Sequence, residues 1–219
     1  MLKTELSHIA LPSLLLLVVA RTAIAGDWAI VTLNDFPEYA VAGSRLNLTF
    51  TIRRQDQFLL SGVRPSIRAT TTGGLTATTG AAPGKGRGHY TAALTLPQAG
   101  DWTMTIVSGF NNTTLTLPAL KVIQPGSTTP IPFSPATRGA RLFSTKGCVG
   151  CHRHIEVNPE RVTDAKLDLT GKRFPPEYLA KFLADPGVKS GAMPNPELKD
   201  DDIAALAAFI DKLVLKTVR

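Results

Sequence analysis

Apolar and polar side chains alternate in short runs between residues 26 and 123. Trp102, Met104 and Ile106, for example, are separated by single threonines. A period of two places alternate side chains on one face of a strand, which packs against a core while the other face meets solvent. The alternation, with the turn residues that interrupt it, predicts the strands Trp28–Leu33, Leu46–Arg53, Val63–Thr71, His89–Leu96, Trp102–Val107 and Thr113–Val122.

Short strands at this spacing, with no competing helical period, are typical of an antiparallel β-sandwich of immunoglobulin type. We therefore expect residues 26–123 to form an N-terminal all-β immunoglobulin-like sandwich domain. The segment Gly73–Gly88 is rich in Gly, Thr and Ala, and it is expected to be a long loop between two strands.

A helical period replaces the alternation toward the end of the chain. It predicts short helices at Ala136–Lys146 and Pro176–Ala184, the second opened by a proline and stopped by the Asp-Pro-Gly at 185–187. A further helix begins at Asp200, where three consecutive aspartates suit the positive end of the helix dipole. Its apolar residues recur at helical spacing and are Ile203, Leu206, Ala207, Ile210, Leu213 and Val214. Residues 136–219 are therefore expected to form an all-α domain.

Between these regions, Gln124–Pro135 carries four prolines in twelve residues. Proline lacks a backbone donor and disfavours helix interiors and central strands, so this segment favours extended polyproline geometry. We expect residues 124–135 to be a semi-stiff linker that marks the boundary between the two domains.

The first 25 residues follow the pattern of a secretory signal. Lys3 gives a positive start, Ile9–Ala20 is almost entirely apolar, and Ala23-Ile24-Ala25 offers small residues at the cleavage positions. The apolar stretch is shorter than the ~20 residues that cross a bilayer as a helix. The pattern predicts a signal peptide over residues 1–25, cleaved after Ala25, and hence a periplasmic or extracytoplasmic protein. The alternative is an uncleaved membrane anchor.

Composition narrows the function classes. With 43% hydrophobic and 19% charged residues, the chain is neither disordered nor a multi-span membrane protein. Two cysteines exclude a disulfide-rich scaffold and a zinc site of four thiolates. The net charge of +7 is spread along the chain without a long basic run, so a nucleic-acid partner is not expected.

Both cysteines lie in one five-residue motif, Cys148-Val149-Gly150-Cys151-His152. This is the attachment signature of haem c. Two thiols three positions apart on a turning backbone reach the two vinyl groups of one porphyrin, and the next residue brings an imidazole to the iron. The motif predicts one covalently attached haem c, with Cys148 and Cys151 as anchors and His152 as an axial ligand.

Three other uses of this motif remain open. A redox-active dithiol is expected inside a βαβ pattern, whereas this motif lies in an all-helical region. A zinc site is awkward because the adjacent residues Cys151 and His152 do not easily point at one metal. A structural disulfide suits an exported protein but leaves His152 without a role.

Two methionines follow the signal segment. Met104 belongs to an alternating strand and is expected in the sandwich core. Met193 lies in a polar, proline-flanked loop where a thioether has no packing role, so we expect it to be the second axial ligand, which raises the redox potential. His154 is too close to His152 in the sequence to reach around the ring, and His89 is expected to be an exposed strand residue.

Residues 136–219 resemble the class I cytochrome c domain family. The resemblance covers the haem motif, Met193 in its loop, and four residues of the first and last helices, Gly139, Phe143, Leu206 and Phe209. In that family the first and last helices cross at a small residue and an aromatic one. The resemblance implies an all-α class I cytochrome c fold, with thioether bonds at Cys148 and Cys151 and with His152 and Met193 as axial ligands. The charged segment Arg153–Asp168 departs from the family's haem-covering loop.

The sandwich region resembles the YtkA-like/FixH-like extracytoplasmic β-sandwich family, in which a glycine-x-tyrosine strand precedes a glycine-x-tryptophan strand. The matching residues are Gly88-His89-Tyr90 and Gly100-Asp101-Trp102. The resemblance transfers no catalytic residues. A copper site is disfavoured, because this region offers only His89 and Met104 as ligands.

An iron with both axial positions filled has no open position for a substrate, so we expect the haem to exchange electrons. The sequence thus predicts an electron-transfer protein or subunit with no catalytic residues, and not an enzyme. The sandwich would dock the haem domain onto a redox partner protein or a membrane respiratory complex, with peripheral membrane association as an option. One alternative is a haem-based ligand sensor with a labile distal ligand, and another is a structural subunit whose haem is a relay.

Basic residues near the motif suggest how a partner is attracted. Exposed cations steer an acidic partner toward its docking site. The candidates are Lys146, Arg153, Lys172, Arg173 and Lys189. The alternative is an ordinary solvated surface.

Overall fold

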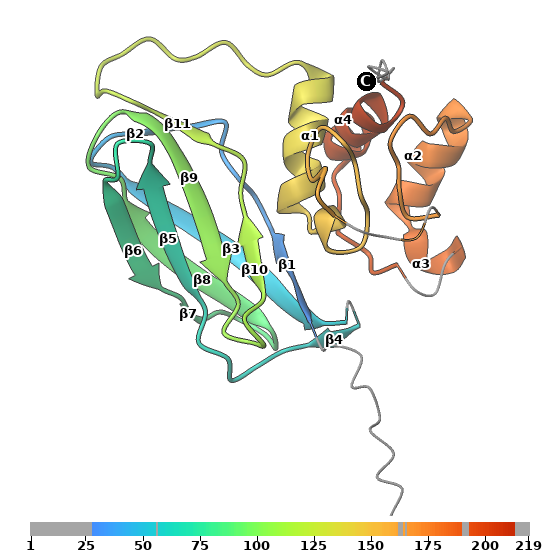
Figure 1. Ribbon diagram of the computed structural model, residues 1–219, viewed down its shortest axis with the longest axis horizontal. Helices are drawn as coiled ribbons and strands as arrows, with labels where there is room; N and C mark the ends of the chain where they lie inside the picture. Colours follow the sequence, from blue (N-terminus) through green and yellow to red (C-terminus); the bar gives the residue numbers. More distant parts are fainter. Residues whose placement is uncertain (1–27, 56, 162–163, 165, 190–192, 213–219) are drawn as a thin grey trace, which may run out of the picture.

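The computed structural model describes residues 28–55, 57–161, 164, 166–189 and 193–212. These residues form a β-sheet domain and a helical domain that lie side by side (Figure 1). The predicted signal segment, residues 1–25, lies outside the described residues, as do Leu213 and Val214 of the last predicted helix. Within the described part of the chain, no helix is long and apolar enough to cross a membrane.

The strands form two sheets (Figure 1). The first sheet has the order β1 (Ala29–Leu33), β3 (Arg45–Arg54), β8 (His89–Thr95) and β7 (Ala82–Pro83), with β4 (Phe58–Leu59) added at β3. The second has the order β2 (Tyr39–Val41), β11 (Leu120–Ile123), β9 (Gly100–Val107), β5 (Ser66–Thr71) and β6 (Thr76–Gly80), with β10 (Thr114–Thr116) added at β9. The pairs are antiparallel apart from β2 with β11, which is parallel.

The two sheets enclose one apolar core, as the alternation predicts. Phe50 of β3 and Trp102, Met104 and Ile106 of β9 are all 0% exposed. Phe50 lies opposite Tyr90 of β8, and the two rings stack with their centroids 6.0 Å apart. The N-terminal region is therefore an all-β domain of two layers, and Met104 is one of its core residues.

The strand prediction misses the short strands β2 and β4 and is wrong in two further details. The predicted loop Gly73–Gly88 contains β6, which pairs with β5 so that Ala77 lies opposite Ala69, and β7, which pairs with β8. β6 is an edge strand whose side chains are half-buried or exposed, so hydrophobic alternation does not reveal it. The predicted strand Thr113–Val122 is divided into β10 and β11, because Pro118 has no N–H to donate to a neighbouring strand.

The helical domain consists of α1 (Pro135–Thr145), the short 3-10 turn η1 (Cys148–Gly150), α2 (Pro176–Ala184), α3 (Pro186–Lys189) and α4 (Asp200–Ile210). Three of these helices were expected from the helical period, whereas the short helix α3 was not. α1 and α4 cross at Gly139, where a Cβ would lie 2.0 Å from the carbonyl oxygen of Ala205. Beside the crossing, Phe143 and Phe209 meet edge to face with centroids 5.7 Å apart. The crossing therefore joins a small residue to aromatic ones, as the resemblance implied.

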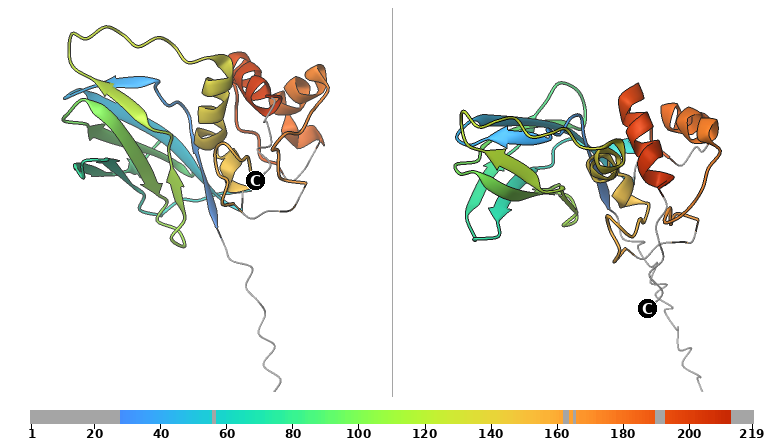
Figure 2. Two further views of the ribbon diagram at one scale, coloured as in Figure 1. Left: turned by 45° about the horizontal axis from the view of Figure 1, so that its top comes forward. Right: turned by 90° about the horizontal axis from the view of Figure 1, so that it is seen from above.

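The helical domain contacts the sandwich on the side of β1 (Figure 2). Arg141 of α1 donates hydrogen bonds to the carbonyl oxygens of Ala119 and Pro37, at 2.7 and 3.2 Å. The same guanidinium lies over the rings of Phe36 and Phe133, 5.1 and 4.8 Å from their centroids. One arginine thus ties α1 both to the sandwich and to the segment that connects the two domains.

Candidate functional site

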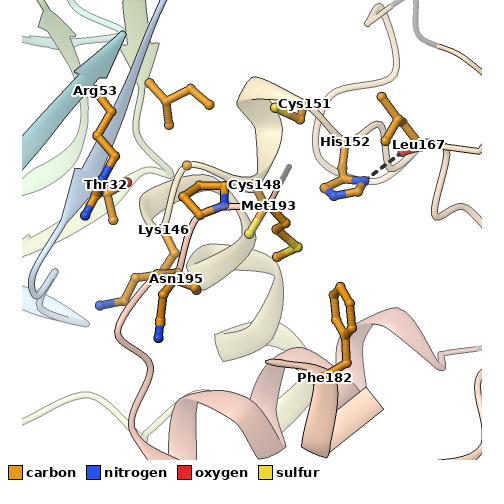
Figure 3. Close-up of a pocket in the computed structure, with 14 residues that line it drawn as sticks. Thr32, Arg53, Lys146, Cys148, Cys151, His152, Leu167, Phe182, Met193 and Asn195 are labelled. Carbon is orange, nitrogen blue, oxygen red and sulfur yellow. Dashed lines mark hydrogen bonds between the residues drawn. The ribbon is translucent and has the colours of Figure 1, made fainter. Parts of the chain in front are cut away.

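The cysteine motif lies in a tight turn directly after α1. Gly147 has a φ of 79°, a left-handed conformation that turns the chain from the helix into η1. The backbone N–H groups of Cys151 and His152 donate to the carbonyl oxygen of Cys148, at 3.1 and 2.8 Å. The turn brings both thiols and the imidazole to the border of one cavity (Figure 3).

A single hydrogen bond orients the ring of His152. Its Nδ1 lies 3.1 Å from the carbonyl oxygen of Leu167 (Figure 3). Because a carbonyl oxygen only accepts, Nδ1 carries the proton and Nε2 keeps its lone pair for a metal. Burial lowers the pKa of His152 by more than the bond to Leu167 raises it, so the ring is neutral at neutral pH.

The charged segment after the motif holds Leu167 in place. Arg153 donates its amide to the carbonyl of Leu167, its own carbonyl accepts from Leu169, and its guanidinium contacts the carboxylate of Asp168 at 2.5 Å. Burial raises the pKa of Asp168, but hydrogen bonds from Thr170 and Arg153 outweigh it and hold the pKa below its ordinary value. The charged residues Arg153 and Asp168, which depart from the family pattern, therefore fix the carbonyl group that orients His152.

Two cavities meet at the motif. The first has a volume of about 270 Å³ and is lined by both cysteines, by His152 and by Met193. The second, of about 190 Å³, reaches into the helical core. Cys148, His152, Phe182 and Met193 line both of them. The structure therefore brings all four predicted site residues to one pair of adjoining cavities.

The wall of the second cavity is mainly apolar. It is formed largely by side chains of α1, α2 and α4, among them Phe143, Leu179, Leu183, Leu206 and Ile210. An apolar slot bordered by an imidazole with a lone pair, a thioether and two thiols offers the donor set and the surroundings that haem c uses. The residues present therefore fit a haem.

The state of the two thiols bears on the three other uses of the motif, which are a redox-active dithiol, a zinc site and a structural disulfide. Burial raises the pKa of the Cys148 thiol to about 12, whereas a reactive dithiol needs a cysteine with a depressed pKa. The sulfurs of Cys148 and Cys151 are not bonded to each other. Among the described residues, no group of three or more His, Cys, Asp or Glu side chains is placed to hold a metal ion.

The two remaining candidate histidines lie elsewhere. His154 is 0% exposed and packs against Phe209 and Phe143, with ring centroids 4.2 and 6.1 Å apart. It lines neither of the two cavities and is a core residue of the helical domain. His89, expected to be exposed, is half-buried instead, because β8 pairs with β3 and places its Nδ1 3.3 Å from Oγ1 of Thr51.

Two of the five cations proposed to steer a partner are paired inside the molecule. Lys146 is 8% exposed, and its Nζ donates to the carbonyl oxygen of Asn34 at 2.8 Å. Arg153 is held by Asp168. Both cations are therefore engaged within the protein, although the Arg153 side chain remains 24% exposed, and Arg173 is exposed as expected. Steering of a partner by these charges stays a prediction.

Sequence reasoning missed several residues that line the first cavity. Phe182 and Leu167 come from the helical domain, whereas Ile30, Thr32 and Arg53 come from the sandwich. The period-two pattern of β1 puts Ile30 and Thr32 on one face. Nothing in that pattern indicates which other part of the chain this face meets.

Residues 134–210 match the family described as cytochrome c oxidase, cbb3-type, subunit III. The match includes α1, the cysteine motif, Met193 and α4. It supports the assignment of this region as a cytochrome c domain, so the chain contains a haem-based electron-transfer module. No curated protein matches the chain.

Two solved structures are similar to part of this chain. The filamin domain of Lin-41 is 14% identical, with a TM-score of 0.36, and the match covers 43% of this chain and 91% of that one. The surface layer protein SbsC, domains 1–6, is 17% identical with a TM-score of 0.33, and the match covers 49% of this chain and 15% of that one.

Proposed function

We propose that this protein is an exported c-type cytochrome that carries one haem c and transfers single electrons. In this proposal the haem is attached through Cys148 and Cys151, with His152 and Met193 as axial ligands. The observation that carries the proposal is that all four residues line two adjoining cavities, one of them with a mainly apolar wall. When bound, the haem supplies an iron that exchanges one electron between its ferric and ferrous forms.

The residues around the cavities have distinct roles in this proposal. His152 would bind the iron through Nε2, while the carbonyl oxygen of Leu167 accepts a hydrogen bond from Nδ1, a second contact of the kind that fixes metal-ligating histidines. Met193 contributes a thioether, which favours the reduced state. Phe143 and Phe182 line the slot and keep water away from it.

With both axial positions filled, no position remains for a substrate, so we infer an electron carrier or a subunit of an electron-transfer complex rather than an enzyme. The sandwich serves to dock the haem domain onto a redox partner protein or a membrane respiratory complex. The signal pattern of residues 1–25 supports a location in the periplasm or another extracytoplasmic space.

The test is a visible spectrum of the full-length protein, expressed with a haem c maturation system and recorded oxidised and reduced, with and without carbon monoxide. We expect a low-spin spectrum that carbon monoxide does not change. Met193→Ala opens one axial position and should give a spectrum that shifts with carbon monoxide. Met104→Leu changes the other methionine, which lies in the sandwich core, and should leave the spectrum as it is.

Two other spectra would contradict the electron carrier. A shift with carbon monoxide in the unchanged protein would favour a haem-based ligand sensor with a labile distal ligand. Protein without covalent haem would overturn both the carrier and the sensor.

A further inference from the structure

The outer face of the β1–β3 pair forms part of the wall of the first cavity. Ile30 and Thr32 of β1 and Arg53 of β3 line this cavity of about 270 Å³ together with both cysteines (Figure 3). Ile30 and Arg53 are direct partners across the two strands. The opposite face of β1, with Val31 and Leu33, belongs to the sandwich core. β1 therefore packs into its own domain on one face and borders the candidate haem site on the other.

This outer face is in close contact with the cysteine motif. A Cβ at Gly147 would lie 2.7 Å from Cγ2 of Ile30, and a Cβ at Gly150 would lie 3.0 Å from Cγ1 of Ile30. Between them, Val149 packs against the cores of both domains. Arg161 donates a hydrogen bond to the carbonyl oxygen of Gly150 and helps to hold the turn. The sandwich thus leaves no room for larger side chains at either glycine.

The hydrogen bond from Lys146 to the carbonyl of Asn34 fixes the same contact just before the motif. Two thioether bonds would in turn hold one edge of a haem beside Cys148 and Cys151. We propose that the haem site is shared between the two domains, and that Ile30, Thr32 and Arg53 cover the cysteine-linked edge of the haem. This inference rests on the haem attachment proposed above.

Arg53 brings a positive charge to the sandwich side of the first cavity. Its side chain is half-buried, and it has no ion-pair partner among the residues that the structure describes. Reduction adds one negative charge to the haem site, and a nearby cation stabilises that charge more strongly where water is excluded. Arg53 therefore favours the reduced form and raises the redox potential.

The first experiment measures the midpoint potential of the full-length holoprotein at low ionic strength. We expect Arg53→Gln to lower the reduced-to-oxidised ratio at a fixed ambient potential roughly three- to tenfold, tenfold being about 59 mV for one electron. The matched control, Arg68→Gln, removes the same charge from an exposed position on β5 in the other sheet and should leave the potential nearly unchanged. An equal effect of both variants, or no effect of either, would overturn the shared site.

Haem content and the visible spectrum distinguish a failure of the proposed function from a failure of the shared haem site. If the unchanged protein takes up no haem, the proposed function fails. If it takes up haem with the expected spectrum but Arg53→Gln keeps the original potential, only the shared site fails.

A second experiment tests whether the sandwich covers the cysteine-linked edge of the haem, by measuring the rate at which ascorbate reduces the holoprotein. Gly150→Leu pushes against Ile30 and should lift the sandwich from the haem edge, so we expect several-fold faster reduction. Adding Ile30→Ala restores the space and should return the rate toward that of the unchanged protein. A Gly150→Leu holoprotein reduced at the original rate would contradict the cover. If that variant does not mature, Ile30→Ala alone keeps the motif intact, and an unchanged rate there would also count against the cover.

Discussion

At the scale of single residues, a backbone carbonyl determines the placement of the candidate iron ligand. The carbonyl oxygen of Leu167 accepts both from Nδ1 of His152 and from the amide of Arg153. The next residue, Asp168, is fixed by the guanidinium of Arg153 and by the amide of Thr170. The orientation of the imidazole therefore depends on an ion pair that does not touch it.

Asp168 should make the stability of the helical domain depend on pH. Its pKa in the folded protein lies below the ordinary value, so its charged form stabilises the fold. This contribution is complete above the unfolded pKa of about 4 and is lost as the pH falls through the lower folded pKa. We expect Asp168→Asn to lower the free energy of unfolding at neutral pH, and the difference from the unchanged protein to shrink in acid.

Urea unfolding of the holoprotein at a series of pH values measures this difference. Asp101→Asn removes an exposed carboxylate on β9 and serves as the control, with a smaller expected effect at neutral pH. A loss of stability in Asp168→Asn that stayed constant into strong acid would show that the charge of Asp168 is not responsible.

At the scale of elements, the crossing of α1 and α4 allows no side chain at Gly139. A methyl group there would meet the backbone carbonyl of Ala205 and the Cβ of Phe209, so the helices must move apart. We expect Gly139→Ala to lower the free energy of unfolding by about 1–3 kcal/mol, the usual cost of overpacking a core. The same change at Gly187 in α3, where the Cβ would have its nearest contact at 3.7 Å, is the matched control in denaturant titrations and should be nearly neutral. Equal effects at the two glycines would rule out the crossing as the cause.

The helical domain should also depend on its cofactor for folding. Its buried core is small, and it borders two cavities that a haem would fill. We expect Cys148→Ala/Cys151→Ala to lose most of the helical signal in far-UV circular dichroism. The near-UV signal of Trp102, which lies in the sandwich core, should stay. A fully native helical signal in this variant would contradict the prediction.

The elements that can be predicted from the sequence are those with one buried face. β3 and β9 show a clear alternation because one face of each lies in the core, and α4 shows a helical period for the same reason. β6 escapes prediction because it is an edge strand of threonine, alanine and glycine without a fully buried face. The motif Cys148–His152 and the isolated Met193 can be recognised from local sequence alone. The contributions of Ile30 and Arg53 cannot, because they depend on how two domains meet.

At the scale of the whole molecule, Arg141 joins the two domains. Arg141→Ala removes hydrogen bonds to the carbonyls of Ala119 and Pro37 and the contacts with Phe36 and Phe133. We expect it to lower the free energy of unfolding by about 1–3 kcal/mol.

Limited proteolysis of the holoprotein checks the prediction for Arg141. Cleavage within residues 124–134 should be faster in Arg141→Ala than in the unchanged protein, because this segment loses an anchor at Phe133. Arg68→Ala, on the far sheet, should be cleaved at the original rate. Equal rates in all three proteins would mean that Arg141 does not hold the domains together.

The contact of Ile30 with Gly147, just before the motif, and with Gly150, inside it, also has a consequence for biogenesis. A catalyst that forms the thioether bonds must reach both thiols, and the docked sandwich covers the side on which Ile30, Thr32 and Arg53 lie. If the haem is attached as proposed, attachment comes first and docking of the sandwich second. The segment between Ile123 and Pro135 would span roughly 35 Å in polyproline geometry, enough to keep the two domains apart until then. The last folding step of this chain would then close the sandwich over a haem that is already in place.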